Sequence, residues 1–202
     1  MAAPGTAAAD KRRVILDAAM RVFARQGFHT CRVSDIADEA GVAYGLVYHY
    51  FSSKEEILDT VFVERWGAML SAIVEADGSV AAPRAKLAAI ASFIVESYRH
   101  EPEVMKVIIV EVTRAANTFG RTHIDMIQDA YRAIAEIVAG GQRSGDFRPE
   151  VDPQLAALAF YGLVEQVLTH WIFEQVPVDD VEVARAKESI VDMICGGLDR
   201  AV

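Results

Sequence analysis

The chain has 202 residues, of which 52% are hydrophobic, so it can bury a sizeable core and is too apolar to be disordered along its length. Its net charge of −9 excludes a uniformly basic protein that coats nucleic acid. Two distant cysteines, Cys31 and Cys195, indicate a reducing cytosol and no disulfide framework. Residues 1–10 do not resemble a signal peptide, and no apolar run reaches the roughly 18 residues of a membrane span. These features predict a cytoplasmic protein.

The charge is distributed unevenly. Residues 1–34 contain six basic and two acidic side chains, whereas residues 57–202 contain 13 basic and 22 acidic ones. A cationic N-terminal segment on an acidic body is typical of a protein that contacts DNA with one end only.

Apolar residues recur at spacings of three and four, which predicts an all-α fold of about nine helices. The first helix contains the apolar face from Val14 to Phe23 and ends at Gly27. Two short helices follow, at about 33–40 and 43–51, with a tight turn at Gly41. Ser53 is the expected N-cap of the next helix, with Glu56 completing a capping box.

That long helix is expected to stop near Gly78, and Pro83 and Pro102 begin the next two. A further amphipathic helix follows Asn117. The clearest linker is 140–153, where glycine, proline, serine and aspartate cluster. Two last helices are predicted at about 153–174 and 179–199.

The two short helices form the most informative segment. Ile36, Ala37 and Ala40 provide an inner face for the first of them. The second helix has an unusual surface, because Tyr44, Tyr48, His49 and Tyr50 crowd it and Gly45 leaves room for close approach to another molecule. A helix that presents hydrogen-bonding aromatics beside a glycine is suited to the major groove of DNA. Lys54, at the start of the next helix, is expected to contact a phosphate.

This segment resembles the DNA-binding head of the TetR family of bacterial repressors. The matching residues are Phe23, Gly27-Phe28, Ile36-Ala37, Ala40-Gly41-Val42, Gly45, Tyr48-His49-Tyr50-Phe51 and Lys54-Glu55. The resemblance implies an N-terminal helix-turn-helix head and a C-terminal helical body for ligand binding and dimerisation. The corresponding division is a disordered tail at 1–10, a head at 11–57 and a body at 58–202. The expected DNA-contacting residues are Arg32, Ser34, Tyr44, Gly45, Tyr48, His49 and Lys54.

Two positions depart from the family pattern. Ala43 stands where the family usually has serine, which removes the expected N-cap of the recognition helix at a cost of roughly 1 kcal/mol. Cys31 and Arg32 stand where threonine and serine are usual, and Arg32 is expected to supply a phosphate contact instead.

The resemblance also implies a homodimer formed by the last two helices, and hence a palindromic operator with half-sites about 34 Å apart. The body is expected to hold a small apolar effector. Its candidate ligand-binding residues are Trp66, Phe93, Tyr98, Ile108, Glu111, Arg114, Phe119, Ile127, Tyr131, Phe160, Leu163, Gln166, His170 and Trp171, with Glu165 and Asn117 as further polar groups. Core packing or dimer contact is the alternative interpretation of each of them.

Two segments, Glu111-Val-Thr-Arg114 and Gly162-Leu-Val-Glu-Gln with His170-Trp171, resemble TetR-family regulators of fatty-acid degradation. The effector implied is a fatty acid or long-chain acyl-CoA, with Arg114 near the mouth of an apolar tunnel. Histidine and cysteine spacings predict no metal site, and nucleophile and nucleotide-binding motifs are missing, so no enzyme is expected. The competing hypothesis is a helical lipid- or acyl-binding protein, or an enzyme, whose head no longer binds DNA; an activator remains a third possibility.

Overall fold

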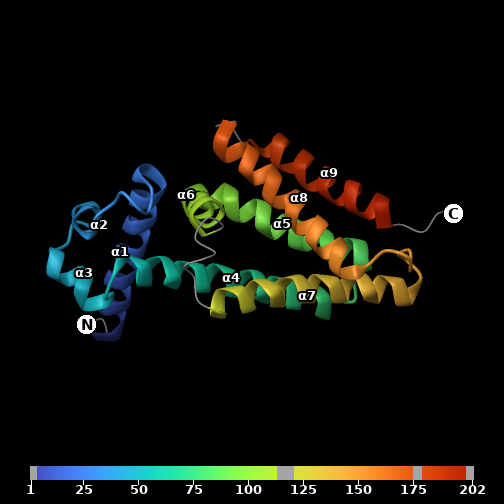
Figure 1. The fold of residues 1–202 in the computed structure, drawn as a ribbon, viewed down its shortest axis with the longest axis horizontal. Coiled ribbons are helices and arrows are strands. Elements are labelled where there is room, and N and C mark those ends of the chain that lie inside the picture. Colours follow the sequence, from blue (N-terminus) through green and yellow to red (C-terminus); the bar gives the residue numbers. More distant parts are fainter. Residues whose placement is uncertain (1–3, 113–120, 175–178, 199–202) are drawn as a thin grey trace. The chain divides into compact units, whose positions relative to one another are not determined.

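The computed structural model describes the backbone of residues 4–112, 121–174 and 179–198, and the side chains of 9–110, 123–173 and 179–198. Within these ranges the chain forms nine α-helices and a short π-helix, and no strand (Figure 1). The all-α prediction is therefore confirmed. The helices are α1 (Pro4–Gln26), α2 (Val33–Ala40), α3 (Tyr44–Tyr50), α4 (Lys54–Gly78), α5 (Pro83–His100), α6 (Pro102–Val107), η1 (Ile108–Val112), α7 (Arg121–Ser144), α8 (Pro153–Glu174) and α9 (Asp180–Leu198).

The chain divides into two compact units, and each is described by itself. The head unit comprises Met1–Glu64 and Glu103–Thr118, and the body unit comprises Arg65–Pro102 and Phe119–Val202. The division falls inside α4 rather than at residue 57, and α6 with η1 joins the head unit. The expected disordered tail at 1–10 also differs from the structure, because α1 begins at Pro4.

The chain ends and restarts its helices at residues with suitable backbone or side-chain chemistry. Gly27 and Gly41 adopt left-handed conformations, with φ of 83° and 64°, at the ends of α1 and α2. Ser53 Oγ accepts the Glu56 N–H at 3.2 Å, as an N-cap does. The Glu56 carboxylate, however, accepts the N–H of Ser52 at 2.6 Å, so the expected capping box is displaced by one residue.

Side chains from α1 to the first half of α4 build the core of the head unit. Ile15, Val22 and Phe23 of α1 are buried, as are Ile36 of α2 and Val47 of α3. Helix α2 packs on both α1 and α3. Because helices as short as α2 and α3 are unstable alone, this packing holds them in place.

Helix α5 is central to the body unit, where it packs against α7, α8 and α9. Helices α8 and α9 also lie side by side (Figure 1). The buried side chains include Leu87 and Ile90 of α5, Ile134 of α7 and Phe160 of α8. Ion pairs join the outer faces of α5 and α9, namely Arg84–Asp192, Glu96–Lys187 and Arg99–Asp180.

Candidate DNA-binding site and effector-binding interior

A three-residue turn, 41–43, connects α2 to α3. The Gly41 N–H donates to the carbonyl of Asp38 at 3.2 Å, and the Val42 N–H donates to that of Ala37 at 3.0 Å. These bonds satisfy carbonyls at the end of α2 and turn the chain sharply, which requires the positive φ of Gly41. The result is two short helices joined by a tight turn, the geometry of a helix-turn-helix.

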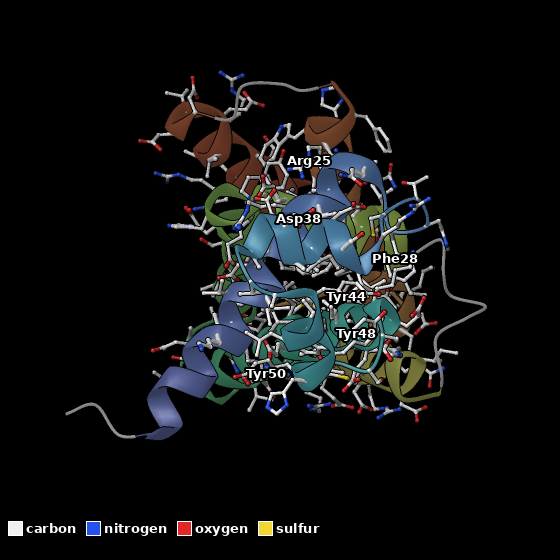
Figure 2. The ribbon with its side chains drawn as sticks, turned by 90° about the vertical axis from the view of Figure 1, so that its left-hand side faces the viewer. Arg25, Phe28, Asp38, Tyr44, Tyr48 and Tyr50 are labelled. Atoms are coloured by element: carbon white, nitrogen blue, oxygen red, sulfur yellow. The ribbon has the colours of Figure 1, made fainter. Side chains whose placement is uncertain are left out.

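The outer face of α3 carries two tyrosines that contact each other. The Tyr44 and Tyr48 hydroxyls share a hydrogen bond at 3.2 Å, and their rings meet edge to face with centres 5.1 Å apart. Tyr44 is 54% exposed and Tyr48 is 45% exposed, and Figure 2 shows them close together on one side of α3. The hydrogen bond shared with Tyr44, together with partial desolvation, raises the pKa of Tyr48, so its hydroxyl stays protonated at neutral pH. The pair therefore presents hydroxyl donors and acceptors to a ligand.

Four other predicted DNA-contacting residues lie on α3 or at the start of α2. Gly45 and His49 are exposed on α3, and Arg32 is exposed at the N-cap of α2. Ser34 is half-buried in the first turn of α2. Ala43 is the N-cap of α3 and provides no side-chain hydrogen bond, as its sequence position predicts. The head thus places these residues on its surface, where their DNA contacts stay a prediction.

Lys54 occupies a position that the sequence did not predict. Its Nζ donates to the carbonyls of Phe28, Cys31 and His29 at 2.7, 3.1 and 3.3 Å. The ammonium also lies 4.7 Å from the centre of the Phe28 ring, a cation–π distance. The first residue of α4 therefore fixes the loop between α1 and α2, and a phosphate would have to share this ammonium with three carbonyls.

We expect Lys54→Met to loosen this loop and to lower the stability of the head unit by about 1 kcal/mol. Hydrogen bonds from a charged donor contribute roughly 1.5–3 kcal/mol, and the partial exposure of Lys54 reduces this. Hydrogen exchange of residues 27–32 without DNA measures the effect. The control is Lys11→Met, which removes an exposed head-unit lysine; equal protection in both variants would contradict the proposed loop contact.

Glu39 of α2 connects that helix to α1. Its carboxylate accepts a hydrogen bond from Arg21 at 2.7 Å and another from Arg25 at 3.1 Å. The Arg21 hydrogen bond, followed by that of Arg25, lowers the pKa of Glu39 below its ordinary value of 4.5. The first helix of the helix-turn-helix is thus held on α1 by charge as well as by its apolar face.

This lowered pKa predicts a pH-dependent effect of Glu39→Gln. Because the folded pKa is lower than the unfolded one, the ionised carboxylate stabilises the fold above about pH 4.5, and the contribution disappears as pH falls through the folded pKa. We expect Glu39→Gln to reduce hydrogen-exchange protection of α2 at pH 7 and to have a smaller effect in acid. A constant difference across the pH range would refute the ionic explanation. Asp17→Asn, which breaks an exposed ion pair within α1, is the control.

Most of the head's arginines are occupied by acidic partners. Arg12 lies 3.3 Å from Glu64, and Arg13 lies 3.0 Å from Asp17. The guanidinium of Arg12 also lies 5.1 Å from the Phe51 ring centre. The basic N-terminal segment therefore uses much of its charge within the head.

The body unit places eight of the predicted ligand-binding side chains in buried or half-buried positions. Buried members are Trp66, Tyr98, Phe160 and Trp171, and half-buried members are Phe93, Ile127, Tyr131 and Leu163. Tyr98 lies 5.6 Å from Trp171, centre to centre. Gln166 and His170 are exposed on α8, so they do not line the interior of this protomer.

Four further predicted residues are not placed in this interior. Ile108 is buried but belongs to the head unit. Glu111 lies in η1 and its side chain falls outside the described residues, as do Arg114 and Phe119 entirely. The predicted charged mouth of a tunnel is therefore not visible in the described chain.

Tyr161 was not predicted as a site residue, although its ring contacts two residues that were. Its ring centre lies 5.8 Å from that of Trp66 and 5.5 Å from that of Tyr131. The available signal was its position four residues before Glu165, which places two polar groups on one face of an apolar helix. Together these residues line an aromatic interior between α4, α7 and α8.

Helix α8 also has a second possible interpretation. Residues 153–173 are long and apolar enough to cross a membrane, and a third of that window is buried. From the sequence, no apolar stretch of this length was predicted. A core helix passes the same test, and the buried side of α8 packs on α5, α7 and α9. In the described parts of the chain no cluster of histidine, cysteine and acidic residues is suited to a metal ion.

The tight turn, the exposed α3 and its supporting helices define a DNA-binding protein of the helix-turn-helix class. Comparison with known protein families supports this class. The model of bacterial regulatory proteins of the tetR family matches residues 15–61, and that of the tetracyclin repressor-like C-terminal domain matches 83–194. The chain belongs to the TetR family of bacterial transcriptional regulators, which are not enzymes.

Its relatives include regulators of fatty-acid metabolism. The fatty acid metabolism regulator protein of Bacillus subtilis (strain 168) is 30% identical over 185 residues, covering 91% of this chain and 93% of the relative. The solved structure of the fatty acid degradation regulator FadR from Bacillus halodurans has a TM-score of 0.82 at 27% identity, covering 99% and 100% of the two chains. FadR from Bacillus subtilis in complex with stearoyl-CoA gives 0.79 at 26% identity, covering 92% and 98%.

Proposed function

We propose that this protein is a ligand-responsive repressor that binds a palindromic operator as a homodimer and is released from it by a long-chain acyl-CoA. The observation that carries the DNA-binding part is the exposed face of α3, where Tyr44, Gly45 and Tyr48 lie without a packing partner in the head core. This face fits a major groove, and His49 and Arg32 extend it. Ser34 and Lys54 complete the proposed contact surface.

The proposed dimer uses α8 and α9. An apolar stripe on α8 is exposed at Leu155, Leu158 and Phe173, and Met193 is exposed on α9. The small residues Gly162 and Gly197 have no atoms near an added Cβ, so a second copy can approach closely there. A four-helix interface between two copies would cover these side chains and account for the membrane-like composition of α8.

The aromatic interior supports an apolar effector. Trp66, Tyr131 and Phe160 provide a large ring surface in the body unit. The relatives that are regulators of fatty-acid metabolism, one solved with stearoyl-CoA, make an acyl-CoA the first effector to examine. Such a ligand would release DNA if it binds the DNA-free arrangement of the dimer more tightly than the DNA-bound one. The protein would act in the cytoplasm.

The decisive experiment measures binding of the purified protein to the DNA upstream of its own gene, followed by titration with stearoyl-CoA. Free CoA and stearate are the controls. We expect nanomolar binding at moderate salt, a protected palindrome, and release by stearoyl-CoA alone. Failure to bind any promoter fragment at low salt would favour a helical acyl-binding protein whose head no longer contacts DNA. Tight DNA binding that no acyl-CoA weakens would refute the effector assignment.

A further inference from the structure

Three polar side chains form a cluster in the body interior. Tyr131 of α7 and Tyr161 of α8 meet edge to face, with ring centres 5.5 Å apart. Glu165 lies one turn after Tyr161 on α8, so both point to the same side of that helix. We call Tyr131, Tyr161 and Glu165 the interior polar cluster.

The surroundings of the interior polar cluster are apolar. Trp66 contacts Tyr161, while Phe160 and Val164, the neighbours in α8, are fully buried. Burial raises the pKa of Tyr131, Tyr161 and Glu165, so the uncharged form of each group is favoured. A carboxyl and two phenols together offer hydrogen-bond donors and acceptors.

The described chain gives these three side chains no hydrogen-bond partner, although each remains half-buried and reachable. The oxygens of the cluster are not among the fully buried side-chain atoms of the described residues, so they remain open to water. A ligand that supplies a matching polar atom would take the place of this water. The cluster is therefore placed as a recognition point within an otherwise apolar lining.

The charged side chains described in the body unit determine whether a charged or an uncharged ligand atom is favoured at the cluster. Every lysine and arginine whose side chain is described in the body unit binds a carboxylate or a main-chain carbonyl. Because these described cations already have partners, none of them is left to neutralise a carboxylate or phosphate placed at the cluster, which would also face Glu165. An uncharged oxygen, in a hydroxyl or keto group, meets no such penalty.

We propose that the interior polar cluster binds an uncharged oxygen substituent on the chain of the effector, so that the protein responds to an oxygenated acyl thioester in preference to a saturated one. This inference rests on the proposed acyl-CoA response. The Tyr161 and Tyr131 hydroxyls and the Glu165 carboxyl would share hydrogen bonds with that oxygen, while the aromatic rings contact the flanking methylenes.

The test compares release of operator DNA by palmitoyl-CoA with release by 3-hydroxy-, 10-hydroxy- and 16-hydroxypalmitoyl-CoA, which place the hydroxyl at both ends and the middle of the chain. At least one hydroxyacyl-CoA should act at about tenfold lower concentration than palmitoyl-CoA, as one well-placed hydrogen bond provides. Tyr161→Phe and Glu165→Leu should abolish this preference, measured within each variant as the ratio of the hydroxyacyl-CoA and palmitoyl-CoA concentrations that release half of the DNA. Thr169→Val, which removes a hydroxyl of α8 outside the cluster and outside the predicted ligand-binding residues, should retain it.

The outcomes separate this inference from the proposed function. Equal release by all four thioesters overturns the cluster's role and leaves the acyl-CoA response intact. A preference that survives in both Tyr161→Phe and Glu165→Leu also overturns it, because another site then reads the oxygen. If no acyl-CoA releases DNA, both proposals fail. Thermal melting checks that each variant is folded, and Tyr161→Phe, which removes a single oxygen, is the conservative reference.

Discussion

Replacing Gly141 by alanine should lower the free energy of unfolding by about 2 kcal/mol. A Cβ at this position would lie 2.4 and 2.9 Å from two carbons of the Phe147 ring and 3.0 Å from Cβ of Pro83. The ring cannot move away easily, because Phe147 is buried and its N–H donates to the Gly141 carbonyl at 3.0 Å. The energetic cost of this steric overlap therefore exceeds the roughly 0.5–1 kcal/mol by which alanine stabilises a helix relative to glycine.

The neighbouring Gly140 is a matched control, since it lies in the same turn of α7. There an added Cβ meets only a guanidinium nitrogen of Arg143 at 3.7 Å, an ordinary contact. Gly140→Ala should leave stability unchanged or raise it slightly. Urea denaturation of both variants at one protein concentration measures the difference. Equal midpoints would show that the α7–α8 connection can repack around Phe147.

Gly45→Ala should weaken operator binding at least tenfold while leaving the free protein as stable as before, or slightly more stable. No heavy atom lies within 4 Å of an added Cβ, and the backbone of Gly45 is helical, so the free protein accepts the methyl group. Alanine also favours the helix by about 0.5–1 kcal/mol. On DNA, the methyl group would occupy the space that close approach to the groove requires.

Gly67→Ala is the control for this effect. Gly67 is also helical and also has no atom near an added Cβ, but it lies in the body-unit part of α4. Operator affinity by fluorescence anisotropy and melting temperature should separate the two variants, with only Gly45→Ala losing affinity. Wild-type affinity for Gly45→Ala would place the groove contact elsewhere on the head.

Local features of the sequence predicted the elements well. The turn at Gly41, the cap at Ser53 and the starts at Pro83 and Pro153 depend on a few neighbouring residues, and the structure has them. The start of α1 at Pro4 was not predicted, because alanines favour helix without producing an apolar periodicity.

Contacts between residues far apart along the chain could not be predicted from the sequence. Lys54 binds carbonyls 23 to 26 residues earlier, and no periodicity encodes such a bond. Tyr161 acquires its place only when α4, α7 and α8 meet, which brings Trp66 and Tyr131 to it. By contrast, the exposed Tyr44–Tyr48 pair follows from a spacing of four on one helix, and the sequence predicted it.

The internal pairing of the head's cations has a consequence for how the protein finds its target. Residues 11–57 carry seven basic and six acidic side chains, and Arg12, Arg21 and Arg25 are bound to glutamates. Few positive charges remain to release counterions from arbitrary DNA. The protein should therefore slide only short distances along the chromosome, with frequent dissociation between encounters. Few copies would be sequestered by the genome, so a small cellular pool could keep one operator occupied.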